Sequence, residues 1–156
     1  MIKKTLQKIF KTISYSLFFK IYGKIYKSIN CEEDNRIEVK KIHLDNNLNY
    51  KVYKIKNGRI YTDRIHDTAI ILDNKIVNEP SFQYRQTHDL KIFNSKVENN
   101  IVFKKGTPRK LRKINGNILS MLTGGGGNDN YWHWLFDVLP RLFFSTVPTI
   151  ESINCL

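Results

Sequence analysis

Apolar and polar positions alternate between residues 50 and 103, which predicts a β-rich region. Tyr50, Val52 and Ile55 indicate one strand, and the Asn57-Gly58 pair after it is a strong turn signal. Residues 59–62 predict the next strand. Weaker patterns predict a strand near residues 37–42 and a short one at residues 101–103.

The middle of this region predicts a hairpin. Residues 68–72 and 75–77 are rich in aliphatic side chains and flank the turn-forming pair Asp73-Asn74. Residues 82–84 either continue the sheet or form a loop that lines a cleft. The region as a whole is expected to lead into an α/β unit.

The spacing of the apolar residues changes after residue 117, from a strand-like to a helix-like pattern. Residues 117–122 are aliphatic and predict a strand, while Gly124 to Gly127 disfavour any regular element because glycine has the most backbone entropy to lose. Residues 128–130 carry side-chain oxygens that can cap a helix, and apolar residues then recur at helical spacing. Pro140 predicts a kink or a tightened turn inside that helix. The pattern is strand, glycine-rich turn, helix.

Three functional side chains fall on one face of the predicted helix. His133, Asp137 and Arg141 stand four residues apart, so they lie one turn above another. A helix start behind a glycine loop also favours an anion such as phosphate. Spacing alone favours a structural His133–Asp137 pair that caps the helix or braces it against the sheet. Arg141 is expected to contact a phosphate or to pair with Asp137.

The first thirty residues form a basic amphipathic segment. One apolar stripe runs through its first half, and from Leu17 to Ile29 lysines occupy the direction of that stripe. This change of phase predicts two short helices, broken near residues 14–16 or loosened at Gly23. The longest uncharged run, residues 12–19, is shorter than the roughly 20 residues that span a bilayer. We expect monotopic attachment to a membrane, or packing on a protein surface.

Charge is concentrated locally. The chain has a net charge of +12, and residues 1–30 contribute seven lysines and no acid. Residues 104–113 form a second basic cluster, suited to anionic lipid, a lipid-linked diphosphate acceptor or nucleic acid, or simply solvated. No nucleic-acid-binding module accompanies it, so no nucleic acid is expected as a partner. Cys31 and Cys155 are far apart, which suits a reducing compartment and predicts no zinc site.

The block from Asn130 to Arg141 resembles the signature of the family 61 glycosyltransferases. Residues 58–63 and 79–83 resemble upstream segments of that family in the same order. The resemblance implies a Rossmann-like GT-B N-terminal domain, entered through its first strand–glycine loop–helix unit, a nucleotide-sugar donor and inversion at the sugar carbon. It implies no cofactor and no metal. Since 156 residues are short for two such domains, we expect an N-terminal portion of a longer enzyme.

The predicted organisation is a membrane-associating segment at 1–30, a polar linker at 31–49 and part of a glycosyltransferase domain at 50–156. The resemblance assigns catalysis to His133 and Asp137, in capsular or surface polysaccharide assembly at the inner face of the cell membrane. The expected partners are the donor, a glycan or lipid-linked acceptor and anionic lipid. The residues expected to bind substrate are Gly125, Gly126, Gly127, Asn128, Asn130, Trp132 and Arg141.

Several alternatives stay open. Trp132 and Trp134 either stack on a sugar or pack against the protein. Asp129 is a rival carboxylate whose first interpretation is a helix cap. Asp63, the pair His66-Asp67 and Gln83 are further candidates for the same cleft. The alternative function is a non-catalytic domain that binds membranes or polyanions.

Overall fold

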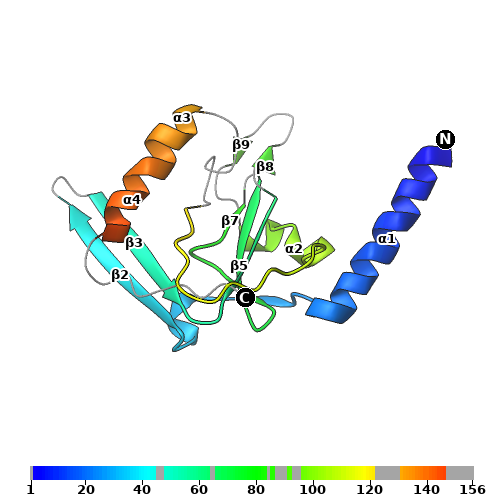
Figure 1. Cartoon of the computed structure of the whole chain (residues 1–156), viewed down its shortest axis with the longest axis horizontal. Coiled ribbons are helices and arrows are strands. Elements are labelled where there is room, and N and C mark those ends of the chain that lie inside the picture. Colours follow the sequence, from blue (N-terminus) through cyan, green and yellow to red (C-terminus); the bar gives the residue numbers. More distant parts are fainter. Residues whose placement is uncertain are drawn as a thin grey trace.

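Strand β5 (Asp67–Leu72) is the centre of the main sheet (Figure 1). Strand β4 (Arg59–Thr62) pairs with one edge of β5, antiparallel, and β6 (Lys75–Val77) and β7 (Phe82–Gln83) share the other edge. Strand β1 (Lys27–Ile29) joins β6 in parallel, so the order is β1-β6-β5-β4. All six residues of β5 are buried, because the sheet is covered on both faces.

The computed structural model describes residues 2–44, 48–63, 66–83, 85–86, 91–92, 96–121 and 131–146. Over these residues the fold is mixed α/β: a long helix, curled β-sheets and a second helical segment (Figure 1).

The turns predicted before β4 and between β5 and β6 are confirmed, so β4, β5 and β6 form an antiparallel meander. Asp73 and Asn74 adopt φ values of +47° and +60° between β5 and β6, and Asn57 adopts +56° before β4. Asparagine and aspartate tolerate this left-handed region better than other non-glycine residues, which is why these pairs form tight turns. The strands predicted at 59–62, 68–72 and 75–77 are therefore present within one residue of their predicted bounds.

Two smaller sheets flank the main one. Strands β2 (Ile37–Leu44) and β3 (Leu48–Ile55) pair antiparallel over their full length, which confirms the strands predicted near residues 37–42 and 50–55. Strands β8 (Arg85–Gln86) and β9 (Lys91–Ile92) form a short antiparallel pair. Figure 1 shows β2 and β3 at the opposite end of the molecule from the N-terminal helix.

Two hydrophobic clusters hold the fold together, one on each face of the main sheet. Alternation along β5 sends Ile70 and Leu72 into the first cluster and Ala69 and Ile71 into the second. The first cluster also takes in η1 (Cys31–Glu33) through the buried Cys31. The second is closed by η2 (Val97–Asn99) and α2 (Val102–Lys105).

The strand predicted at residues 101–103 is wrong, because α2 occupies this place. The Asn100 side chain accepts a hydrogen bond from the Val102 N–H at 3.3 Å, and the Lys105 N–H donates to the Ile101 carbonyl at 2.9 Å. Gly106 then ends the turn at φ +60°. Local side-chain and backbone hydrogen bonds therefore outweigh the β propensity of this short run.

The strand predicted at residues 117–122 is also not found over residues 117–121. No described strand lies beside them to accept their backbone hydrogen bonds. An aliphatic run supplies side chains suited to a sheet, but a strand needs a paired neighbour.

Helix α1 (Ile2–Tyr22) is one continuous helix, so the predicted break near residues 14–16 is wrong. Gly23 at φ +78° ends it, and β1 follows instead of a second helix. Lys24 and Lys27 therefore lie outside the helix, and the predicted change of phase disappears. A single apolar stripe remains along α1.

Candidate functional site

The described part of the block that resembles the glycosyltransferase signature, residues 131–141, folds as one helical segment, as predicted. It consists of α3 (Tyr131–His133), the π-helical turn η4 (Trp134–Val138) and α4 (Leu139–Thr146). The Leu139 N–H donates to the carbonyl of Trp134, five residues earlier. Pro140 has no N–H for the carbonyl four residues before it, and its ring crowds that carbonyl. The turn is therefore widened, where a kink or a tightened turn was predicted.

The widened turn carries the three predicted functional residues. His133 is half-buried at the end of α3, and Asp137 lies in η4 with its side chain outside the described part of the structure. Arg141 donates from Nη1 to the carbonyl of Met121 at 3.0 Å. Arg141 thus ties α4 to the segment after α2.

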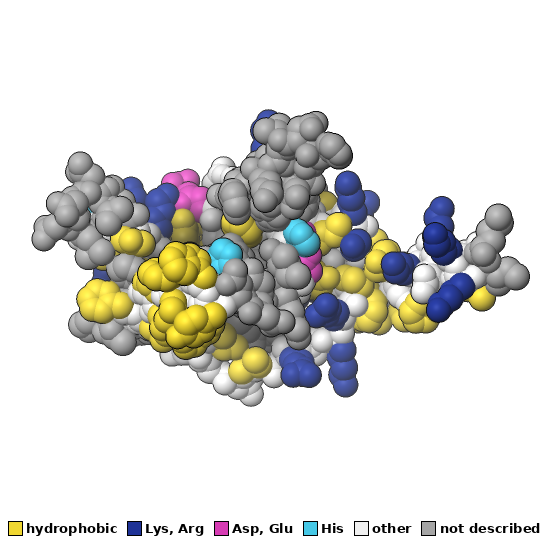
Figure 2. Space-filling view, turned by 90° about the horizontal axis from the view of Figure 1, so that it is seen from above, with side chains coloured by type: hydrophobic (Ala, Val, Ile, Leu, Met, Phe, Trp, Pro, Cys, Tyr) yellow, Lys and Arg dark blue, Asp and Glu magenta, His cyan; other side chains and the backbone are white. Residues whose placement is uncertain are grey.

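The aromatic residues around His133 are exposed. The exposed fractions are 72% for Tyr131, 65% for Trp132, 49% for Trp134 and 56% for Phe136, whereas Val138 is buried. The rings of Trp132 and Phe136 contact each other in a tilted arrangement, with centroids 4.2 Å apart and an interplanar angle of 38°. Hydrophobic side chains gather there on the surface, left of centre in Figure 2. Such a patch is typical of a surface that meets another partner or ligand.

Other predicted binding residues cannot be placed. Gly125, Gly126, Gly127, Asn128 and Asn130 lie outside the described residues, as does the rival Asp129. The predicted glycine turn, and the anion site at its helix start, therefore stay predictions.

The candidates Asp63, His66 and Asp67 have structural hydrogen bonds. Asp63 Oδ1 accepts from the His66 and Asp67 N–H groups at 2.8 and 2.9 Å, closing the turn before β5. Asp67 is 3% exposed, and its Oδ1 accepts from the Ile101 N–H at 3.2 Å. These contacts account for the two carboxylates without a ligand.

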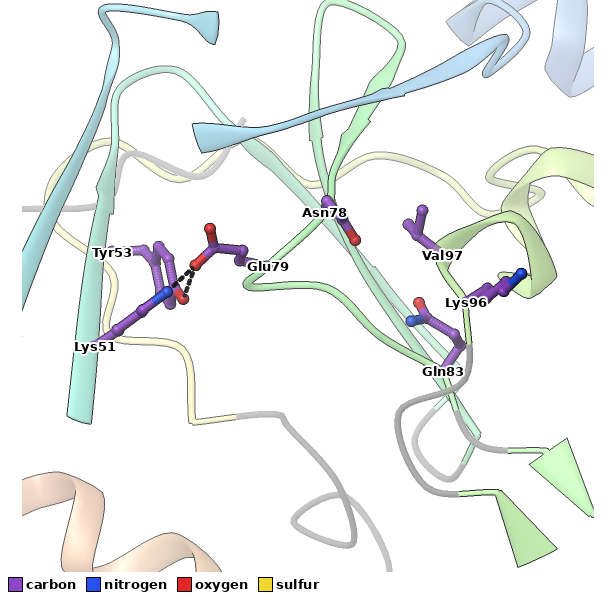
Figure 3. Close-up of a pocket in the computed structure, with 7 residues that line it drawn as sticks. All are labelled: Lys51, Tyr53, Asn78, Glu79, Gln83, Lys96 and Val97. Carbon is purple, nitrogen blue, oxygen red and sulfur yellow. Dashed lines mark hydrogen bonds and ion pairs between the residues drawn. The ribbon is translucent and has the colours of Figure 1, made fainter. Parts of the chain in front are cut away.

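Gln83, in contrast, lines a cavity of about 460 Å³ between β3, the β6–β7 connection and η2 (Figure 3). Its Oε1 also accepts a hydrogen bond from Asn100 Nδ2 at 3.3 Å, and this bond holds the Gln83 side chain in its orientation. The other lining residues are Lys51, Tyr53, Asn78, Glu79, Lys96 and Val97. The cavity is within the size range of small-ligand sites.

Glu79 accepts two side-chain hydrogen bonds at the edge of this cavity. Its Oε2 accepts hydrogen bonds from Lys51 Nζ at 2.6 Å and from the Tyr53 hydroxyl at 2.8 Å (Figure 3). The hydrogen bond from Lys51, followed by that from Tyr53, lowers the pKa of Glu79. Burial, with the Glu79 charge, raises the pKa of Tyr53. The carboxylate is therefore ionised at neutral pH and presents an acceptor to a ligand.

Lys51, Tyr53 and Glu79 were not among the predicted site residues. Lys51 and Tyr53 are two apart on β3, so alternation puts them on one face of the strand. Glu79 belongs to the family-like segment 79–83. The alternation along β3 and the family-like segment 79–83 each indicate some of the residues that line the cavity. Neither pattern predicts that β3 and this segment lie next to each other.

The described residues contain no group of three or more His, Cys, Asp or Glu side chains placed to hold a metal ion. Cys31, next to Glu79, is buried, and burial raises the pKa of its thiol to about 11. A thiol that is protonated at neutral pH is a poor nucleophile. The available chemistry is that of the histidine, the carboxylates and the basic side chains.

Comparison with protein-family models gives no match for this chain, and neither curated proteins nor solved structures give a significant one.

Proposed function

We propose that this chain is part of a glycosyltransferase that moves a sugar from a nucleotide-sugar donor to a glycan or lipid-linked acceptor. The setting is surface or capsular polysaccharide assembly at the inner face of the cell membrane. We propose that the described α/β fold is part of the N-terminal domain of a Rossmann-like GT-B enzyme. In such a domain residues 117–121 would form a strand only when further strands of the Rossmann-like sheet pair with them.

One observation carries the proposal: the residues that resemble the family 61 signature fold as a single helical segment with an exposed aromatic surface. His133 is half-buried within this segment, and Arg141, near the start of α4, donates a hydrogen bond to the Met121 carbonyl. In a GT-B enzyme reaction takes place in a cleft between two domains, and a large exposed apolar surface beside a histidine suits one wall of such a cleft.

In the proposed reaction His133 removes the proton from the acceptor hydroxyl. The acceptor oxygen forms a bond to the anomeric carbon as the bond from that carbon to the nucleotide diphosphate breaks, with inversion. The diphosphate leaves with the electron pair, and the helix start and the segment Gly125 to Asn130 would stabilise its charge. Asp137 orients the imidazole and stabilises its cationic form.

In this proposal Arg141 has a positioning role, which is supported by the hydrogen bond from its Nη1 to the Met121 carbonyl. A guanidinium has five N–H donors, so the proposal keeps it as a phosphate contact as well. Trp132 is 65% exposed and presents its ring for stacking on a sugar.

A non-catalytic domain that binds a membrane or polyanion is the second candidate. The concentration of lysines in α1 and at residues 104–113 favours it. This candidate predicts binding without turnover under every condition.

The test is sugar transfer by the chain, and by the product of any reading frame that continues past Leu156, with a panel of nucleotide sugars. His133→Ala should lower transfer about 10²–10⁴-fold, as expected for a lost general base, with little change in melting temperature. His43→Ala, at an exposed position on β2, is the matched control and should keep full activity.

Two outcomes would refute the catalytic assignment. One is a His133→Ala protein that melts much earlier but transfers sugar in proportion to its folded fraction, which is the result that a structural histidine predicts. The other is the absence of transfer from every donor in the longer product. For the chain by itself we expect little or no transfer.

A further inference from the structure

Two short segments hold the whole positive excess of this protein. The first is the set of seven lysines before residue 30, and the second is Lys104, Lys105, Arg109, Lys110, Arg112 and Lys113. Neither segment contains an acid. The rest of the chain has the other thirteen Lys and Arg against all 14 Asp and Glu, so it is close to neutral.

The fold brings these two segments together, although they are about 90 residues apart. The Leu111 N–H donates to the Tyr22 hydroxyl at 3.0 Å. Gly106 lies so close to Phe19 that a Cβ on the glycine would be 2.7 Å from Cε1 of the ring. Lys and Arg side chains next to Leu111 are therefore held beside the end of α1. Figure 2 shows the basic side chains gathered along this half of the surface.

Helix α1 is attached to the protein through its C-terminal half. Tyr15, Phe18, Phe19 and Tyr22 are half-buried on one side of the helix. Arg59 fixes the end, because it donates from Nη1 to the Tyr22 carbonyl at 3.4 Å and from Nη2 to Asn74 Oδ1 at 3.1 Å. The first three turns of α1 extend away from the sheets (Figure 1).

The apolar stripe of α1 lies on the side of the helix that is turned away from these contacts. At about 100° per residue, its centre falls roughly opposite the face of Tyr15, Phe18 and Tyr22. Each of its side chains is between 51% and 73% exposed: Leu6, Ile9, Phe10, Ile13, Leu17 and Ile21. Lys3 and Lys20 fall at the two edges of the stripe, where their stems can follow an apolar surface and their ammonium groups can reach phosphate.

We propose that α1 and residues 104–113 form one two-part docking surface for an anionic membrane. The stripe of α1 lies in the interface, along the roughly 30 Å length of the helix. The basic segment is held at the C-terminal end of the helix on the side away from the stripe, and it attracts the acidic head groups through its long side chains and within the Debye length of about 10 Å. Among the described residues no helix has the length and hydropathy to cross a bilayer. The inference deepens the proposed membrane location and is measured without donor or acceptor, so it can fail separately from the transfer reaction.

Charge and hydrophobicity together select this partner. A nucleic acid would use the lysines but leave six large apolar side chains in water. A second copy of the chain would cover the stripe but bring two sets of lysines together. An anionic bilayer satisfies both features at once.

The experiment is co-sedimentation of the full chain with vesicles of 30% phosphatidylglycerol in phosphatidylcholine, and with phosphatidylcholine alone. The stripe variant is Leu6→Gln, Ile13→Gln and Leu17→Gln, which keeps helix propensity. The segment variant is Arg109→Gln, Lys110→Gln, Arg112→Gln and Lys113→Gln. The charge-matched control is Lys40→Gln, Lys41→Gln, Lys56→Gln and Lys96→Gln, at exposed positions away from α1.

The wild type should bind the anionic vesicles and bind less at high salt. The segment variant should lose about fivefold in partitioning per charge removed, and the stripe variant about tenfold or more per side chain. The control should stay close to wild type. Circular dichroism checks that each variant is folded.

Three results would overturn the proposal. The control could lose as much binding as the segment variant, which would mean that only net charge matters. The stripe variant could bind a DNA duplex as tightly as wild type while the wild type ignores vesicles, which would identify a polyanion site. The wild type could form a dimer that the stripe variant cannot form, again without vesicle binding, which would assign the stripe to a second copy.

Discussion

Replacing Gly106 by alanine should weaken the junction between α1 and the segment after α2. Gly106 has φ +60° and ψ −148°, a region used essentially by glycine alone. An alanine there costs on the order of 1–3 kcal/mol in backbone strain. The new Cβ would also lie 2.7 Å from Cε1 and 3.0 Å from Cδ1 of Phe19. Overpacking of this kind costs about 1–3 kcal/mol more.

The expected loss in free energy of unfolding is therefore about 2–6 kcal/mol, a large part of the roughly 5–15 kcal/mol of a typical domain. Gly116→Ala is the matched control, since Gly116 has φ +113° but no atom within 4 Å of the new Cβ. It should show the backbone cost alone. Phe19→Leu added to Gly106→Ala should recover part of the loss, because it removes ring atoms that the new methyl group meets.

Urea unfolding followed by circular dichroism at 222 nm measures these differences. Limited trypsin digestion reports the same junction locally, because Lys20 and Lys24 flank it. Equal unfolding midpoints for Gly106→Ala and Gly116→Ala would refute the reasoning. The contact with Phe19 would then contribute nothing to stability.

Two further predictions concern stability. Ile71→Ala should lower the free energy of unfolding, measured in urea, by about 2–5 kcal/mol, because Ile71 is only 2% exposed. Ile114→Ala, at a 50% exposed position, should change it by no more than about 0.5 kcal/mol. Similar losses for both variants would show that the β5 core is misassigned. The hydrogen bond from Arg36 lowers the pKa of Asp34 to about 2, so its carboxylate stabilises the fold above its unfolded pKa of about 3.9, and this stabilisation is lost as pH falls through 2. The difference in melting temperature between wild type and Asp34→Asn should therefore be largest above pH 5 and should close towards pH 2, and a constant difference would contradict the assignment.

The local parts of the fold could be predicted from the sequence. Asn57, Asp73 and Asn74 fix their turns through their own conformational preferences, so the meander followed from residues next to one another. The helix after residue 130 could likewise be predicted, because its apolar residues recur at helical spacing. These elements depend on short-range chemistry that a sequence displays directly.

Two of the errors fall where distant residues decide the structure, and the third is local. Residues 117–121 have a strand-like composition but no described neighbour to pair with. Residues 102–105, in contrast, become helical through local contacts, because the Val102 N–H donates to the Asn100 side chain and Gly106 ends the turn. The length of α1 depended on Gly23, whose fit against Asn74 is a contact across the fold.

The candidate site was predictable only in part. The histidine block could be identified because its residues are consecutive, and Gln83 because it lies in a family-like segment. The cavity around Glu79 needs Lys51 and Tyr53, which reach it from another strand 26 to 28 residues earlier. A pattern along one strand cannot show which distant loop will meet it.

The parallel pairing of β1 with β6 has a consequence for the order of folding. Lys27 pairs with Lys75, so this contact closes a long loop, whereas β4, β5 and β6 meet through short turns. Contact order therefore predicts that the β4–β6 meander nucleates folding and that β1 docks afterwards. Substitutions in the meander should slow folding, and those in β1 should mainly speed unfolding. Helix α1 directly precedes β1, so we expect it to pack against the sheets late as well, and its apolar stripe to be exposed before the rest of the domain has folded.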